Sequence, residues 1–159
     1  MYYAPKRDIT RGEFIKLLVA STSEPLDSEF DLSVYQDAGS IPDWVTPYVR
    51  KAVEKGWVKG RAVNGKIYLD VNSQITREEA FTLIFRVFVK EMPENIERAN
   101  FLDMDSVSAY AVDAVNYLAH IKIVEGDGTG RVRPGSNITR EETAKILYEC
   151  IRALAYKKR

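Results

Sequence analysis

The chain has 159 residues, with 23 basic and 23 acidic side chains and one cysteine. A chain of this length can bury one core, so one compact domain is expected rather than two. The balanced charge argues against nucleic acid or a membrane surface as partner, and no apolar run approaches the roughly 20 residues that span a bilayer. Cys150 cannot form an internal disulfide and is expected to be a small core residue.

The first predicted element is a helix that begins after Thr10. Glu13 follows three positions later, and Thr-x-x-Glu is the capping box, in which each side chain accepts from the other residue's backbone N–H; each such cap contributes about 1 kcal/mol. This helix start occurs three times, as Ile9-Thr10-Arg11, Ile75-Thr76-Arg77 and Ile138-Thr139-Arg140, with Glu13, Glu79 and Glu142. The isoleucines are 75 − 9 = 66 and 138 − 75 = 63 residues apart, which identifies a repeat protein.

Each capped helix carries apolar or small residues at offsets 4, 7, 8 and 11 after its threonine, the period of one buried face. They are Phe14, Leu17, Leu18 and Ser21, then Ala80, Leu83, Ile84 and Val87, then Thr143, Ile146, Leu147 and Cys150. We expect the three capped helices to pack together by these faces. A short extended piece precedes each one: Tyr3-Ala4-Pro5, Leu69-Asp70-Val71 and Val132-Arg133-Pro134.

A second type of helix is expected between the capped helices, from about 42 to 55 and from 108 to 121. Trp44 and Tyr110 occupy equivalent positions in the two copies. Gly56 is placed to end the first of these two helices, as a residue in the left-handed conformation after the last helical turn. Its counterpart is Lys122, so the second copy is expected to end differently.

The repeating unit is therefore helix, glycine-bearing turn, extended piece and capped helix. The chain holds about two and a half units: residues 1–34 form the second half of the first unit plus a polar connector, residues 35–100 the second unit and residues 101–159 the third. The missing half-unit should leave apolar surface exposed. We expect this surface to be covered by the connector at 21–34, by the C-terminal helix or by a second copy of the chain in a homo-oligomer.

This ordered pattern resembles the S-layer homology (SLH) family of bacterial cell-wall anchoring modules. It is carried by YQD, DWVTPYV, GWVKG, YAP and ITRGE, and by FLD, VEGDGTG, VRP and ITREE in the last copy. The resemblance implies an all-α, pseudo-threefold fold with a central three-helix bundle and outer lobes. It also implies a non-catalytic module of a secreted, cell-surface protein that binds secondary cell-wall polysaccharide, often pyruvylated, between adjacent units. No signal peptide precedes the first repeat, so a fragment of a longer exported protein is expected.

Arg11, Arg77 and Arg140 each occupy the first helical position, where the helix macrodipole disfavours a cation by about 0.3–1 kcal/mol. This repeated cost suggests a bound anion, held by free backbone N–H groups at the helix start and by the guanidinium. The alternative is that each arginine pairs with an acidic residue of the next unit, such as Asp37 or Asp103. The two alternatives can coexist in one groove.

The resemblance implies further residues lining the grooves. They are Thr10, Thr76 and Thr139 at the helix starts and Gly56, Gly60 and Gly126 in the turns. In the last copy of this surface Lys122 stands in place of the first turn glycine. Trp44 is predicted either to stack on a sugar or to anchor the core, and the same alternatives hold for Tyr110.

The sequence offers little for catalysis, and we expect neither an enzyme nor a cofactor or metal site. His120 is the only histidine, and no histidine or cysteine cluster has metal-ligand spacing. The run from Glu125 to Gly130 lacks the ligand pattern of a calcium loop, so a tight turn is expected. The alternative to wall anchoring is a protein-interaction or self-assembly module that uses the same grooves.

Overall fold

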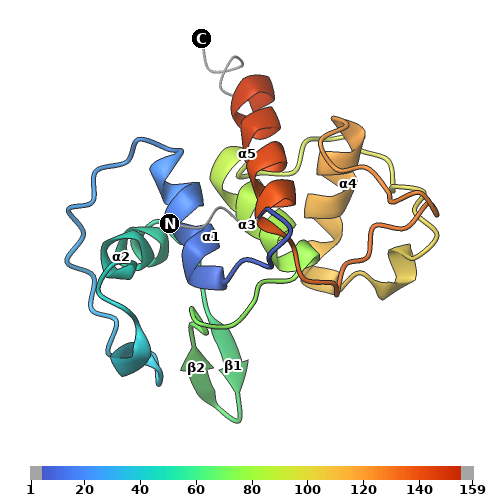
Figure 1. Cartoon of the computed structure of the whole chain (residues 1–159). Helices are drawn as coiled ribbons and strands as arrows, with labels where there is room; N and C mark the ends of the chain where they lie inside the picture. Colours follow the sequence, from blue (N-terminus) through green and yellow to red (C-terminus); the bar gives the residue numbers. More distant parts are fainter. Residues whose placement is uncertain (1–4, 155–159) are drawn as a thin grey trace. The chain divides into compact units, whose positions relative to one another are not determined.

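The computed structural model describes residues 5–154, so Tyr3 and Ala4 of the first extended piece lie outside the described residues. The described part is mostly helical, with five α-helices and one two-stranded sheet (Figure 1). Contacts divide it into two compact units, one of residues 9–74 and one of residues 75–159 together with 1–8. The expectation of a single compact domain is therefore not met, and each unit is described by itself. The repeat boundaries at 34/35 and 100/101 stay a prediction.

The unit of residues 9–74 is built on two helices that contact each other, α1 (Arg11–Ala20) and α2 (Thr46–Glu54). Residues 42–45 form a turn instead of helix, and α2 begins where Pro47 suits its first turn. A short 3-10 turn, Ala38–Ser40, precedes α2.

A β-hairpin in the same unit corrects the all-α prediction. Strands β1 (Arg61–Val63) and β2 (Lys66–Tyr68) pair antiparallel, with Val63 opposite Lys66. The two residues between them, Asn64 and Gly65, have φ of 51° and 77°. Asn-Gly is favoured in such two-residue hairpin turns because both central residues need positive φ.

The unit of residues 75–159 contains α3 (Arg77–Phe88), α4 (Val112–His120) and α5 (Arg140–Leu154). Helix α3 contacts both α4 and α5. Two 3-10 turns, Met104–Ser106 and Ala109–Ala111, precede α4, which therefore begins later than predicted. The contact between α3 and α5 agrees with the predicted packing of the capped helices, whereas the threefold arrangement stays a prediction.

The predicted helix starts are confirmed. The Thr10 hydroxyl accepts from the Glu13 N–H at 3.1 Å, and the Glu13 carboxylate accepts from the Thr10 N–H at 3.2 Å. Thr139 and Glu142 make the same two bonds, at 3.2 and 3.4 Å. The Thr76 hydroxyl also caps its helix, and it donates to the Glu79 carboxylate at 2.9 Å.

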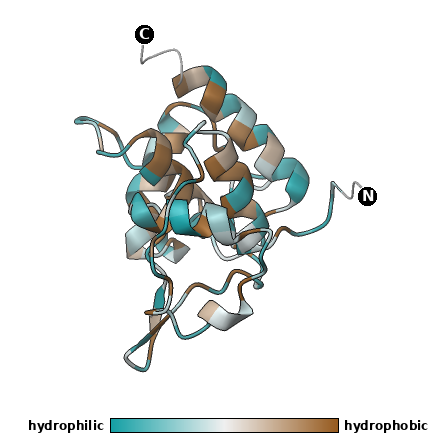
Figure 2. Ribbon diagram, turned by 90° about the vertical axis from the view of Figure 1, so that its left-hand side faces the viewer, coloured by the Kyte–Doolittle hydropathy of each residue, from teal (hydrophilic) through white to brown (hydrophobic). Residues whose placement is uncertain are grey.

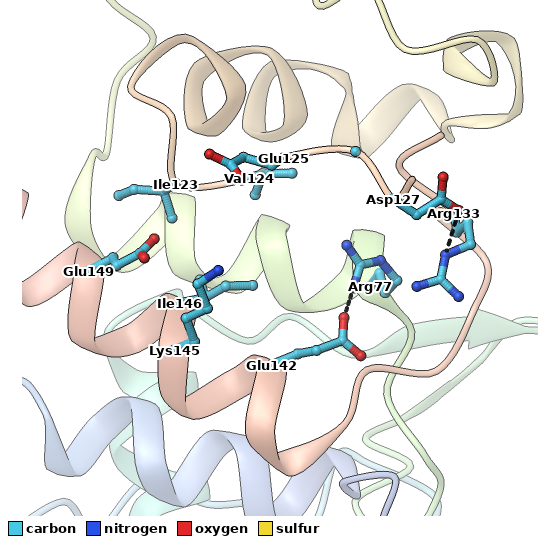
Figure 3. Close-up of a pocket in the computed structure, with 11 residues that line it drawn as sticks. Arg77, Ile123, Val124, Glu125, Asp127, Arg133, Glu142, Lys145, Ile146 and Glu149 are labelled. Carbon is cyan, nitrogen blue, oxygen red and sulfur yellow. Dashed lines mark hydrogen bonds and ion pairs between the residues drawn. The ribbon is translucent and has the colours of Figure 1, made fainter. Parts of the chain in front are cut away.

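The helices carry both hydrophobic and hydrophilic residues (Figure 2), and the residues of the predicted faces are buried at most positions. Cys150, for example, is fully buried, as predicted. Ser21 is only half-buried, and Leu17 is the clearest exception: it is 43% exposed, whereas its counterparts Leu83 and Ile146 are buried. Ile146 and Ile123, which lies in the turn after α4, line the same groove (Figure 3), whereas residues 5–34, the described part of the first repeat, contain no equivalent turn. None of the described helices is both long and apolar enough to cross a bilayer.

The prediction that the two second-type helices end differently is wrong. Gly56 follows α2 with φ of 74°, and the N–H groups of Trp57 and Val58 both donate to the Ala52 carbonyl, at 2.9 and 3.2 Å. Lys122 follows α4 with φ of 63°. The next two N–H groups, of Ile123 and Val124, donate to the Leu118 carbonyl at 2.9 and 3.1 Å. The hydrogen-bond pattern is thus kept, and a lysine adopts a conformation that favours glycine.

Lys122→Gly should therefore stabilise the protein by about 1 kcal/mol, because a left-handed conformation costs an L-residue roughly this much. Chemical denaturation would measure the change. Lys55→Gly is the matched control: Lys55 has φ of −77°, so glycine there should destabilise by about 0.5–1 kcal/mol. A loss of stability in Lys122→Gly would contradict this account.

Candidate functional site

A groove of about 230 Å³ lies in the unit of residues 75–159, between α5 and the turn that follows α4 (Figure 3). Its apolar part is formed by Ile123 and Val124 of the turn and Ile146 of α5. Arg77, at the start of α3, closes one end. The groove thus joins the predicted second and third repeats, where the resemblance places a binding site.

Arg77 is held rigidly in the wall of this groove. Only 7% of the residue is exposed, and its guanidinium lies 5.3 Å from the centre of the Phe81 ring. Its Nε donates to the Val132 carbonyl at 2.8 Å, and Nη1 donates to the Glu142 carboxylate. Burial lowers the pKa of Arg77, and the nearby Arg133 lowers it further. Arginine nevertheless stays protonated, so a fixed cation faces the groove.

Arg77 pairs with an acidic residue of the next repeat, as the alternative interpretation expects, but this residue is Glu142 and not Asp103. The other carboxylate oxygen of Glu142 caps α5. Asp103 instead accepts from the N–H groups of Val132 and Arg133, at 2.9 and 2.8 Å. It therefore holds the extended piece to which Arg77 is bonded.

Asp37 plays the same part in the unit of residues 9–74. Its carboxylate accepts from the N–H groups of Leu69 and Asp70, at 2.9 and 2.8 Å. Arg11 Nε donates to the Leu69 carbonyl at 3.2 Å. The aspartate, the extended piece and the arginine are therefore connected in the same order in both units.

The expectation of free backbone N–H groups at the helix starts is also wrong. In α3, the N–H groups of Arg77 and Glu78 donate to the carbonyls of Ser136 and Pro134, at 2.8 and 3.0 Å. Equivalent bonds run from Arg11 and Gly12 to Ser73 and Val71, and from Arg140 and Glu141 to Arg7 and Pro5. The hydroxyls of Thr10, Thr76 and Thr139 are occupied in the caps. An anion in this groove would therefore meet side chains rather than the ends of helices.

Four charged residues that the sequence analysis did not assign to a groove also line it: Glu125, Arg133, Lys145 and Glu149. Lys145 is exposed on α5 and makes no ion pair with any residue that the structure describes. The Lys145 and Glu149 side chains lie one helical turn apart, and Glu125 lies in the turn after α4 (Figure 3). Carboxylates beside a lysine and an arginine suit a ligand that has hydroxyl groups and a negative charge.

The turn from Glu125 to Gly130 is stabilised by Asp127. Its carboxylate accepts from the Thr129 N–H at 2.7 Å and the Thr129 hydroxyl at 2.6 Å, and Arg133 Nε lies 3.3 Å away. The hydrogen bonds from Thr129 lower the pKa of Asp127 to about 2. Within residues 5–154, no group of three His, Cys, Asp or Glu side chains is placed to hold a metal ion.

The predicted turn glycines have different surroundings. Gly126 lines the groove, and a Cβ there would lie 3.2 Å from the Phe101 ring. Gly60 has φ of 82°, and a Cβ would lie 2.9 Å from Ile67 and from Tyr35. Gly56 ends α2. Gly60 is thus required by local structure, whereas the conformation of Gly56 favours glycine without requiring it.

Trp44 is 50% exposed, so its interpretation as a core anchor is wrong. Lys16 Nζ lies 5.5 Å from the centre of the Trp44 ring and 5.7 Å from that of Tyr48. Lys16 and Trp44 are exposed and Tyr48 is half-buried, so these three residues form a surface with two aromatic rings and a cation in the unit of residues 9–74. Tyr110, the counterpart of Trp44, is also exposed, and its hydroxyl donates to Glu78 at 3.4 Å.

Arg77→Ala should destabilise the protein by about 2 kcal/mol, because it breaks two hydrogen bonds of a buried charge and leaves Glu142 without its partner. Chemical denaturation would measure this loss. Arg98→Ala is the control, since the Arg98–Asp105 pair is exposed and should contribute less than about 1 kcal/mol. Equal losses in the two variants would show that Arg77 is not the structural residue described above.

Comparison with known families and proteins gives a consistent result. The family model for the S-layer homology domain matches residues 34–81 and 100–144. A surface-layer 125 kDa protein of Lysinibacillus sphaericus is 33% identical over 80% of the chain, and an amylopullulanase of Thermoanaerobacterium thermosulfurigenes is 29% identical over 92%. An endoglucanase of Bacillus sp. (strain KSM-635) is 27% identical over 91%. The chain spans only 10%, 8% and 15% of these three proteins.

Proposed function

The chain belongs to the S-layer homology domain family, which indicates anchoring at the cell surface, and we propose that it attaches a larger secreted protein to the bacterial envelope by binding anionic, pyruvylated cell-wall polysaccharide. In this proposal the chain itself is non-catalytic. The relatives support it, because SLH sequence occurs in a surface-layer protein and in enzymes that are many times longer than the chain. A module shared by proteins with such different names fits attachment better than a reaction.

The groove beside α5 is the proposed binding site, and the exposed Lys145 is the observation that carries this assignment. Its ammonium is available to the carboxylate of a pyruvyl group, whereas the Arg77 charge is already paired with Glu142. Glu125 and Glu149 are placed to accept from sugar hydroxyls. The remaining N–H groups of Arg77 supply donors with fixed geometry.

The surface formed by Lys16, Trp44 and Tyr48 is proposed as a second contact. An aromatic ring offers a flat apolar face to a sugar, and Lys16 adds a charge next to it. Two weak contacts to one polymer strengthen overall binding, because the second forms at a high effective concentration once the first has formed.

The first test is sedimentation of the protein with purified cell-wall sacculi, before and after chemical removal of the wall polysaccharide. Binding should be lost on removal. Binding that does not change would contradict the polysaccharide proposal and favour a protein partner.

Lys145→Ala should weaken binding to intact sacculi about tenfold or more, since a charge-assisted hydrogen bond is worth about 1.5–3 kcal/mol. The unfolding midpoint should change little, because Lys145 is exposed. Lys66→Ala, which removes an exposed lysine from β2, is the matched control and should bind normally. Normal binding by Lys145→Ala, together with loss on stripping, would leave the anchor intact and exclude this groove as its site.

A further inference from the structure

The groove beside α5 contains two carboxylates whose charge the protein does not balance. Seven charged residues line the groove, and four of them form the two ion pairs described above. The remaining three are Lys145, Glu125 and Glu149. None of these three forms an ion pair or a side-chain hydrogen bond with any residue that the structure describes. One positive and two negative charges are therefore available to a ligand, which is more acid than the recognition of an anion requires.

The two carboxylates lie at the same end of the groove. Figure 3 shows Glu125 and Glu149 on the side of Ile123, whereas Arg77 lies at the opposite end. Glu125 is exposed, but Glu149 is half-buried. Partial burial removes part of the hydration of the Glu149 carboxylate, so leaving this group without a partner costs free energy that a bound cation would recover.

The acidic end is a property of the last repeat. The offset of 66 residues between the two second-type helices places Glu125 at the position of Lys59. The offset of 63 residues between the capped helices places Glu149 at the position of Arg86. The second repeat thus has basic residues where the last repeat has acids.

The ion pair that joins the turn to the extended piece is reversed in the same way. In the last repeat, Asp127 of the turn lies 3.3 Å from Nε of Arg133. At the equivalent positions of the second repeat, Arg61 is paired with Asp70. The pairing is kept while the signs of its partners are exchanged. Four charge reversals at matched positions indicate that the last repeat suits a ligand group of opposite charge.

An ammonium group fits this end of the groove better than a metal ion. Calcium takes six to eight oxygen ligands, and the described residues hold no group of three His, Cys, Asp or Glu side chains placed for a metal. A primary ammonium has three N–H donors, so two carboxylates and one water satisfy it. Neutral hydroxyl groups would donate to the carboxylates but leave their charge unbalanced.

We propose that the groove beside α5 recognises an amino sugar with a free, protonated amine, next to an anionic group of the same polymer. This inference rests on the proposed function, because it takes wall polysaccharide as the ligand. The ammonium donates to Glu125 and Glu149, and the anion binds Lys145. An N-acetylated sugar carries no charge on its nitrogen and would leave both carboxylates without a cation, so the groove discriminates against it.

The first experiment uses polysaccharide released from sacculi, with and without treatment by acetic anhydride in bicarbonate. This treatment converts amines to uncharged amides and leaves carboxylates unchanged. Isothermal titration should show that the original chain binds the acetylated polysaccharide about fivefold more weakly, the size of effect expected for a partly exposed charge pair. Glu149→Gln should bind the untreated polysaccharide about fivefold more weakly, and acetylation should then change its affinity little.

Glu94→Gln is the matched control, because Glu94 is exposed between α3 and α4 and does not line the groove. It should bind both polysaccharides as the original chain does. Equal binding of both by the original chain would overturn the proposal and leave the anchoring function intact. Binding that EDTA abolishes would also overturn it, because a metal ion would then occupy the acidic end.

A second experiment tests the amine without the polymer. In nuclear magnetic resonance spectra of the chain, glucosamine should shift the amide signals of residues 123–126 and 145–149, whereas N-acetylglucosamine should not. Glu149→Gln should lose these shifts. No shift with glucosamine, or equal shifts with both sugars, would overturn the proposal. Shifts with glucosamine in a chain that does not bind the polysaccharide would support the amine site and contradict only the anchoring function.

Discussion

The structure depends on how the capped helices begin. The first two N–H groups of each one donate to carbonyls of an extended piece that is distant in sequence: residues 71 and 73 at α1, 134 and 136 at α3, and 5 and 7 at α5. These N–H groups have no partner within their own helix. A buried N–H group without a partner costs roughly 1–3 kcal/mol, so each helix start requires an extended piece. The repeats are thus linked through their backbones, not only by apolar packing.

This constraint also accounts for the arginines. An arginine at the first helical position is disfavoured by the macrodipole, but here its side chain lies against the extended piece that the backbone already binds. Arg77 Nε donates to Val132 and Arg11 Nε to Leu69, in each case two residues before a carbonyl that accepts from the helix start. The arginine is therefore a structural residue that also forms the wall of a groove.

The sequence predicts the parts of the fold that repeat within the chain. The three threonine helix caps and most buried positions follow from local pattern, and those predictions are confirmed. The partners of the helix starts could not be predicted, because a cap pattern does not say which distant carbonyls lie near it. The left-handed conformation of Lys122 could have been predicted, because its position is equivalent to that of Gly56. The residue type alone argued against this conformation. Asn64-Gly65 is a local sequence signal for a hairpin turn, but the prediction was based on the repeat pattern and did not include the hairpin.

The position of the groove could be predicted from the sequence, but the charged groups that line it could not. Arg77 and Gly126 come from repeated motifs, whereas Lys145 has a counterpart in Lys16 but a threonine, Thr82, in the middle copy, so repetition does not reveal it. In the proposed function, a ligand in this groove would bind through the groups that the fold leaves available. Glu142 is committed twice, once to the cap of α5 and once to Arg77. A ligand anion that displaced the Glu142 carboxylate would have to break both its cap bond and its ion pair with Arg77. The anion is therefore expected to approach Lys145. Binding there would leave the helix start intact and add to its stability by mass action.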